Sequence, residues 1–237
     1  MPSRILYMPY FQYGAVEIAH LQARDPTLGV AIDRIGWIER EMRPGLFPVL
    51  VHGLVSQQIS NAAAATVWRR FIARVGDLTP ARLGQTPLAD LRACGVSLRK
   101  AERLHRSSER VLSGALDLAA LPARPDAEVI RILSAVPGVG VWTAEMLSIF
   151  ALGRPDVVGR GDRAIRRGMR RLYGVETLNP ARFTQYRERY RPYGTVASFY
   201  LWALAARPTE TAILAHPAPA SIPATRGSRR TWKIPPS

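Results

Sequence analysis

The segment 133–144, LSAVPGVGVWTA, constrains the fold of this 237-residue chain most strongly, because it joins two helical patterns through a Pro-Gly-x-Gly turn. Gly138 and Gly140 permit positive φ values and expose backbone N–H groups where the second helix begins. The helix dipole favours an anion at that end. The turn would therefore suit a phosphate group. A plain helix–helix turn explains the same residues, so the surrounding sequence must separate the two interpretations.

The rest of the body also shows helical patterns separated by glycine and proline, without a convincing strand of period two. Apolar spacing predicts a helical region over 47–75 and a helix over 97–112 that Ser97 caps. Asp126 is expected to cap a helix over 127–135. The remaining expected helices cover 141–152, 162–173, 180–188 and 194–206. We therefore expect an all-α protein.

The composition changes after residue 207, where the chain becomes rich in Pro, Ala, Ser and Thr without a hydrophobic period. We expect one folded domain over 1–207, in which the N-terminal segment packs with the C-terminal helices, and a disordered basic tail over 208–237. Four basic residues and one acidic residue give the tail a net charge of +3. About +12 of the total of +15 therefore belongs to the folded part.

The net charge of +15 and a pI of about 11.1 favour a polyanionic partner such as nucleic acid. Only Lys100 and Lys233 of the 33 basic residues are lysines, and such an arginine bias can equally follow from a GC-rich genome. Cys94 is the only cysteine, which excludes an internal disulfide, a multi-cysteine zinc site and a four-cysteine iron–sulfur cluster. The sequence has no long apolar run and no signal-peptide pattern, so we expect a cytoplasmic, nucleoid-associated protein without membrane contact.

Four separated blocks carry a resemblance to a known family: 54–60 (LVSQQIS), 136–144 (VPGVGVWTA), 155–166 (PDVVGRGDRAIR) and 191–202 (RPYGTVASFYLW). In this order and spacing they resemble the helix-hairpin-helix (HhH-GPD) DNA glycosylase superfamily, and within it the 3-methyladenine DNA glycosylase II branch. The resemblance implies two helical lobes with the active-site cleft between them. It also implies a monomer whose partner is double-stranded DNA with a damaged base. The DNA-binding hairpin would consist of Pro137, Gly138, Val139, Gly140 and Thr143.

Asp162 stands at the end of Gly-Arg-Gly-Asp, where the resemblance places the catalytic aspartate. Hydrolysis of an N-glycosidic bond builds positive charge on the sugar, and a carboxylate can stabilise that charge while it orients or deprotonates water. From its position alone, Asp162 could simply cap the helix that follows it. The two roles are compatible, because a helix start stabilises a negative charge. Asp156, the other carboxylate of the block, is expected to shape the loop.

A glycosylase with lyase activity needs an amine that forms a Schiff base with the sugar. The hairpin position that carries lysine in such relatives is Trp142 here, and neither Lys100 nor Lys233 lies in a matching motif. The resemblance thus implies a monofunctional enzyme without AP lyase activity. We expect no metal site and no cofactor, apart from a monovalent cation that the hairpin backbone could hold.

The resemblance also assigns residues that extrude and receive the base. Gln57 and Gln58 stand where these enzymes push a side chain into the vacated stack, and Gln58 is the preferred wedge. Trp142, Met146 and Trp202 match positions of the base pocket. An alkylated, cationic purine such as 3-methyladenine or 7-methylguanine would gain a cation–π interaction there. Each tryptophan could equally be an ordinary core residue, and Trp37, which has no match, is expected in the core.

Two other functions stay open from the sequence. A noncatalytic helix-hairpin-helix DNA-binding protein would keep the hairpin and the basic charge without needing Asp162 or the aromatic pair. A glycosylase for deaminated, mismatched or oxidised bases would share the hairpin and the aspartate but would line its pocket with hydrogen-bonding groups. The run 154–171 contains seven arginines, several of which could contact phosphates, although a solvated helix face is the usual meaning of such a run.

Overall fold

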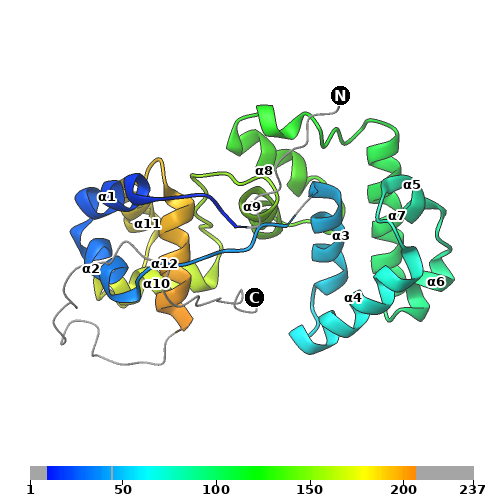
Figure 1. Cartoon of the computed structure of the whole chain (residues 1–237), viewed down its shortest axis with the longest axis horizontal. Helices are drawn as coiled ribbons and strands as arrows, with labels where there is room; N and C mark the ends of the chain where they lie inside the picture. Colours follow the sequence, from blue (N-terminus) through cyan, green and yellow to red (C-terminus); the bar gives the residue numbers. More distant parts are fainter. Residues whose placement is uncertain (1–9, 44, 207–237) are drawn as a thin grey trace. The chain divides into compact units, whose positions relative to one another are not determined.

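The structure is a computed structural model that describes residues 10–43 and 45–206. These residues form twelve α-helices and one short 3-10 helix, and their only β-type pairing is an isolated bridge between Tyr10 and Glu41 (Figure 1). The all-α prediction is therefore confirmed. None of the described helices is long and apolar enough to cross a membrane. The tail predicted over 208–237 lies outside the described residues.

The chain forms two compact units. Among the described residues, unit 1 combines 10–42 with 153–206, and unit 2 comprises 43 and 45–152. They correspond to the two helical lobes that the sequence predicts. The cleft between the lobes stays a prediction.

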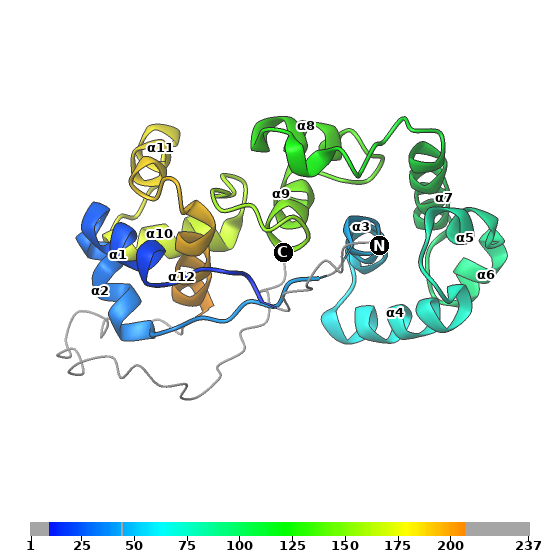
Figure 2. The same ribbon diagram turned by 45° about the horizontal axis from the view of Figure 1, so that its top comes forward.

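Unit 1 is built around a buried C-terminal helix. Its helices are α1 (Ala15–Arg24), α2 (Pro26–Ile35), α10 (Arg163–Tyr173), α11 (Pro180–Arg189) and α12 (Gly194–Ala206). Every residue of α12 except the last is buried, and α10 runs beside it (Figure 2). Gly168 permits this close approach, because a Cβ atom there would overlap the Leu201 carbonyl oxygen.

Asp25 fastens the N-terminal helices of unit 1 to its C-terminal ones. The buried carboxylate caps α2 by accepting the Leu28 N–H at 3.0 Å. Its other oxygen accepts the Tyr173 hydroxyl at 2.5 Å and lies 3.5 Å from the Arg189 guanidinium. This buried network makes the N-terminal segment part of the scaffold that carries α10.

Unit 2 encloses one continuous apolar core. Its helices are α3 (Leu46–Ser56), α4 (Asn61–Val75), α5 (Pro80–Gln85), α6 (Leu88–Ala93), α7 (Leu98–Leu112), α8 (Asp126–Ser134) and α9 (Val141–Phe150), with the 3-10 helix η1 at Leu121–Ala123. Leu50, Leu54, Phe71 and Leu104 are fully buried in this core. The core thereby joins the α3 and α7 helices that flank the hairpin turn.

The structure corrects three expectations from the sequence. The region 47–75 is interrupted at 57–60, and Ser60 caps a new helix by accepting the Ala63 N–H at 3.3 Å. Asp126 is the first helical residue instead of the cap, because Pro125 occupies the cap position. Trp37 is not a core residue: it is 52% exposed and stacks on Tyr13, with the ring centroids 4.2 Å apart.

Candidate active site

Asp162 occupies the N-cap position of α10. Its Oδ1 atom accepts the Ala164 N–H at 2.7 Å and the Ile165 N–H at 2.9 Å. The residue is only 5% exposed, although an unpaired carboxylate is rarely buried. The two amides and the positive end of the helix dipole compensate for the lost hydration of its charge. The capping role that the sequence allowed for Asp162 is therefore present.

Trp202, on α12, holds the second oxygen of the same carboxylate. Its Nε1–H donates to Asp162 Oδ2 at 3.2 Å, so both oxygens accept hydrogen bonds from groups of unit 1. The Trp202 side chain is 3% exposed, and its ring lies beside Phe199 with the centroids 6.0 Å apart. The structure thus brings together Asp162 and one of the three predicted pocket residues, in a buried contact that the sequence did not indicate.

Arg40 places a positive charge beside this aromatic pair. Its guanidinium carbon lies 5.9 Å from the Trp202 ring centroid and 5.6 Å from that of Phe199. Burial lowers the pKa of Arg40 to about 10, which still leaves it charged at neutral pH. A cation already beside Trp202 makes this ring a poor platform for a second cation. Sequence reasoning missed Arg40, because an isolated arginine carries no motif.

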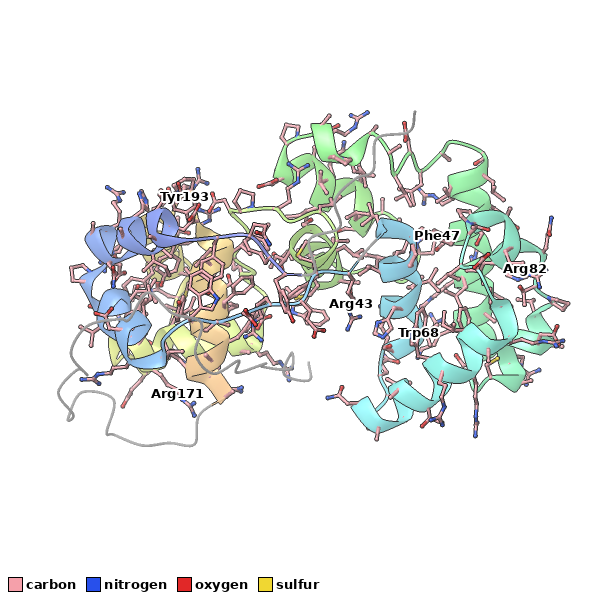
Figure 3. All side chains as sticks on the ribbon, in the orientation of Figure 1. Arg43, Phe47, Trp68, Arg82, Arg171 and Tyr193 are labelled. Atoms are coloured by element: carbon pink, nitrogen blue, oxygen red, sulfur yellow. The ribbon has the colours of Figure 1, made fainter. Side chains whose placement is uncertain are left out.

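Five of the seven arginines in the run 154–171 fall into two groups. Arg166, Arg167 and Arg171 donate to the carbonyls of Leu178, Ala205 and Leu204, at 2.6, 3.1 and 2.8 Å, and so hold unit 1 together. Figure 3 labels Arg171. In contrast, Arg160 and Arg163 are exposed on either side of Asp162.

Asp156 is tied into the scaffold of unit 1. Its Oδ1 atom accepts the Gly194 N–H at 3.1 Å, and its Oδ2 atom pairs with Arg187 at 3.0 Å. This carboxylate therefore fastens the loop to α11 and α12, in line with its expected role in shaping the loop.

The hairpin turn lies between α8 and α9 in unit 2. Gly138 has φ +90 and lies so close to Leu54 and Arg103 that a Cβ atom would crowd both side chains. Val139 is buried and donates its N–H to the Val136 carbonyl at 2.9 Å. Exposed Gly140 is the N-cap of α9 and provides no side-chain cap. The N–H groups of the first turn of α9 therefore point out of the helix beside an exposed glycine, as an anion site requires.

The other predicted pocket residues lie on α9. Trp142 is half-buried on its first turn, and Met146 follows one turn later on the same face, 9% exposed. Thr143 packs its methyl group beside Gly53 of α3. The predicted pocket residues thus belong to different units: Trp142 and Met146 to unit 2, and Trp202 to unit 1.

The two predicted wedge residues form the turn after α3 and have different environments. Gln57 is half-buried and donates its Nε2–H to the Gly138 carbonyl at 2.8 Å. Gln58 is exposed, and it is the only non-glycine residue with positive φ, +57, among the described residues. Such a conformation costs about 1 kcal/mol or more and marks positions that the surroundings hold in place. The geometry therefore favours Gln58 as the protruding residue and gives Gln57 a supporting contact.

Lys100, on α7, contacts this turn through its side chain, a role that sequence reasoning missed. Its Nζ atom donates to the Val55 carbonyl at 2.9 Å and to the Gln57 carbonyl at 2.5 Å. Burial, followed by the neighbouring Arg103 charge, lowers the pKa of Lys100. The available signal was compositional: a lysine is rare in this arginine-rich chain.

The described residues contain no group of three His, Cys, Asp or Glu side chains that could hold a metal ion. A monovalent cation at the hairpin would need carbonyl oxygens as ligands. The Gly138 carbonyl already accepts Gln57, and the Val136 carbonyl accepts Val139, so each offers one remaining lone pair.

The chain is similar to proteins of one family. The family model described as "HhH-GPD superfamily base excision DNA repair protein" matches residues 51–192. DNA-3-methyladenine glycosylase 1 of Schizosaccharomyces pombe is 34% identical over 163 residues, which cover 65% of this chain and 69% of the relative.

Two solved structures extend the similarity to the fold. The crystal structure of a DNA-3-methyladenine glycosidase from Bacillus halodurans is 37% identical with a TM-score of 0.77, and the match covers 84% of this chain and 93% of that chain. The Schizosaccharomyces pombe 3-methyladenine DNA glycosylase in complex with abasic DNA is 28% identical with a TM-score of 0.68, and the match covers 79% and 95%.

Proposed function

Because this chain belongs to the HhH-GPD superfamily of base excision DNA repair proteins, as its four sequence blocks predict, we propose that it is a monofunctional DNA glycosylase for alkylated purines. It hydrolyses the N-glycosidic bond of bases such as 3-methyladenine and 7-methylguanine in double-stranded DNA and leaves an abasic site. The observation that carries the proposal is the Asp162 carboxylate, which is buried yet held by three N–H donors.

In this proposal, Asp162 acts on the sugar of the extruded nucleotide. As the glycosidic bond breaks, the sugar develops oxocarbenium character, and a fixed carboxylate stabilises that charge. The two α10 amides and Trp202 Nε1 fix the position of the carboxylate before the substrate binds. Asp162 also orients or deprotonates the attacking water. An alkylated purine is a good leaving group, so the reaction needs no strong general acid.

Trp142 and Met146 are the proposed base-contacting residues on unit 2. The half-buried Trp142 indole offers a cationic base a cation–π interaction of roughly 0.5–2 kcal/mol. The proposed role of Trp202 differs from the base-stacking role that its sequence position suggests. The Trp202 N–H positions the Asp162 carboxylate. The positive charge of nearby Arg40 disfavours a second cation on the Trp202 ring, so the main proposed role of Trp202 is to hold the carboxylate.

The proposed DNA contacts come from exposed groups of each unit. The N–H groups at the start of α9, which follows the hairpin turn 137–140, bind a backbone phosphate, and Gln58 fills the gap that the extruded base leaves. Arg160 and Arg163 are the proposed phosphate contacts of unit 1, because they are exposed next to Asp162.

The absence of lyase activity is part of the proposal. Trp142 stands at the hairpin position where a lyase needs an amine, and the Lys100 amine donates to two backbone carbonyls. These two carbonyls fix the Lys100 side chain in the scaffold of unit 2, so we do not propose it as the amine of a lyase.

The test incubates the full chain with duplexes that each hold one 3-methyladenine, 7-methylguanine, hypoxanthine or uracil, and measures the free base released. We expect release of the two alkylated purines. Release confined to hypoxanthine or uracil would point to a glycosylase for deaminated bases. Binding of the duplexes without release of any base would leave a noncatalytic DNA-binding protein.

A further inference from the structure

Three hydrogen bonds connect α7, the turn after α3 and the hairpin. Lys100 Nζ donates to the carbonyls of Val55 and Gln57 at 2.9 and 2.5 Å, and Gln57 Nε2 donates to the Gly138 carbonyl at 2.8 Å. We call these three bonds the Lys100 clamp. All of its groups belong to unit 2, and they link segments that are 43 to 81 residues apart in the sequence.

The clamp provides hydrogen-bond donors for the carbonyls at the end of α3, which have no partner within the helix. The last carbonyls of a helix lack intrahelical partners and carry the negative end of the helix dipole. At the end of α3 the chain leaves the helix at Gln57, where ψ is 139, and Gln58 then adopts φ +57. No glycine takes up this reversal. The Lys100 ammonium supplies the donors and the positive charge, so the Gln58 conformation depends on a residue of another helix.

The clamp also fixes the distance between two DNA-contacting groups. Gln57 bonds to the hairpin through its side chain and to Lys100 through its carbonyl. Gly138, its hairpin partner, is in turn packed against Arg103, which lies one helical turn after Lys100 on α7. The turn with Gln58 and the hairpin therefore move as one body on the α7 scaffold.

We propose that Lys100 is a positioning residue for base extrusion: it holds Gln58 rigid relative to the phosphate-binding hairpin. The inference rests on the proposed function, in which Gln58 enters the base stack. When the hairpin binds a backbone phosphate, a rigid Gln58 is held at a fixed distance from that phosphate and therefore inserts between the stacked bases. A loose Gln58 would let the flipped base return. The clamp therefore matters when the lesion is well paired and not when the base is already unpaired, because extrusion is then less costly.

The experiment compares the full-length wild type with Lys100→Met and Lys100→Arg. Single-turnover excision of 7-methylguanine is measured at saturating protein, with the lesion either paired with cytosine or placed in single-stranded DNA. For Lys100→Met we expect at least a tenfold lower rate on the paired lesion and less than a threefold change on the single strand. Lys100→Arg keeps the charge and should recover part of the loss. Arg99→Met removes an exposed neighbouring charge and should leave the ratio of the two rates unchanged.

A second readout is independent of catalysis. The base 2-aminopurine, placed beside a tetrahydrofuran abasic analogue, increases its fluorescence when a wedge opens the stack. Wild type and Arg99→Met should produce the increase, and Lys100→Met should lose most of it at saturating protein, with a melting temperature measured in parallel. Equal fluorescence for wild type and Lys100→Met, or equal loss on paired and single-stranded lesions, would overturn the inference. A wild type that opens the stack but releases no base would refute the proposed function while leaving the role of Lys100 in place.

Discussion

The indole Nε1 of Trp202 lies 3.2 Å from Oδ2 of Asp162, so two residues forty positions apart share one buried hydrogen bond. The bond joins the N-terminus of α10 to the middle of α12. It gives the carboxylate a fixed orientation that a helix cap alone would not provide, because the capping amides contact only Oδ1. If Asp162 is the catalyst, Trp202 should affect the rate through the carboxylate.

Trp202→Phe tests this relationship, since it keeps an aromatic ring and removes the N–H donor. A hydrogen bond to a charged group contributes about 1.5–3 kcal/mol, so we expect excision to slow by roughly ten- to a hundredfold. The reduction should be the same factor for cationic 7-methylguanine and for any neutral base that the enzyme releases. A loss confined to cationic bases would show that Trp202 acts by stacking on the base instead.

Exposed Arg160 and Arg163 should contribute to phosphate binding. For each variant, Arg160→Ala and Arg163→Ala, we expect weaker binding of any duplex and a salt dependence whose slope falls by about 0.9 in log Kd against log salt. Fluorescence anisotropy between low and moderate salt measures this slope. Arg182→Ala removes an exposed arginine of α11 and is the matched control. Slopes identical to wild type in both variants would contradict the assignment.

The fate of the abasic product tests the monofunctional assignment. Borohydride reduces a Schiff base to a stable covalent link, so a lyase becomes trapped on DNA that holds an abasic site. We expect no covalent complex on a denaturing gel and no strand cleavage after heat-free quenching. A trapped species that disappears in Lys100→Met would show that the clamped amine attacks the sugar.

His52 should make the stability of unit 2 depend on pH. Arg43 donates to His52 Nδ1 at 2.8 Å, and Trp68 packs against the same ring with the centroids 4.7 Å apart. Figure 3 labels Arg43 and Trp68. Burial and the Arg43 charge lower the pKa of His52 from 6.5 to about 4. As the pH falls, His52 therefore binds a proton at a higher pH in the unfolded chain than in the folded protein. The free energy of unfolding should be constant above about pH 7 and decrease between pH 6.5 and 4.

Because His52 is partly exposed, the expected decrease is about 1–2 kcal/mol. Urea unfolding at pH 7.5, 6 and 5 measures it for the wild type and for His52→Gln, which cannot be protonated in this range. The variant should lose less stability than the wild type on acidification. Parallel curves for the two proteins would show that His52 does not titrate as described.

Local signals predicted much of the fold. Ser97 caps α7, and α10 begins after Asp162 and ends before Gly174, whose left-handed conformation is typical of a helix end. Four helices, α1, α2, α5 and α6, were not predicted. Thr79 followed by Pro80 is nevertheless a recognisable helix start for α5.

Other features depended on long-range contacts. The interruption at 57–60 was hidden because apolar residues continue on both sides of it. It is supported by Lys100 and by the hairpin, which follow much later in the chain. The direction of the Trp202 N–H depends in the same way on how closely α12 packs against α10 at Gly168. Residue types and spacing therefore predicted Asp162 as a cap, whereas its third hydrogen-bond donor required the packed structure.

The most direct test of the central claim is the single-turnover rate of base release by Asp162→Asn. Asparagine is a good N-cap through its side-chain oxygen, but its amide group leaves the buried Trp202 Nε1–H without an acceptor. We therefore expect a folded variant that is about 1–3 kcal/mol less stable than the wild type and binds abasic duplex with similar affinity. It lacks the negative charge that stabilises the sugar, and we expect its rate on 7-methylguanine duplex to fall by a thousandfold or more, roughly 4 kcal/mol in activation free energy. Release at the wild-type rate by a folded, DNA-binding Asp162→Asn would contradict the assignment of Asp162 as the catalyst.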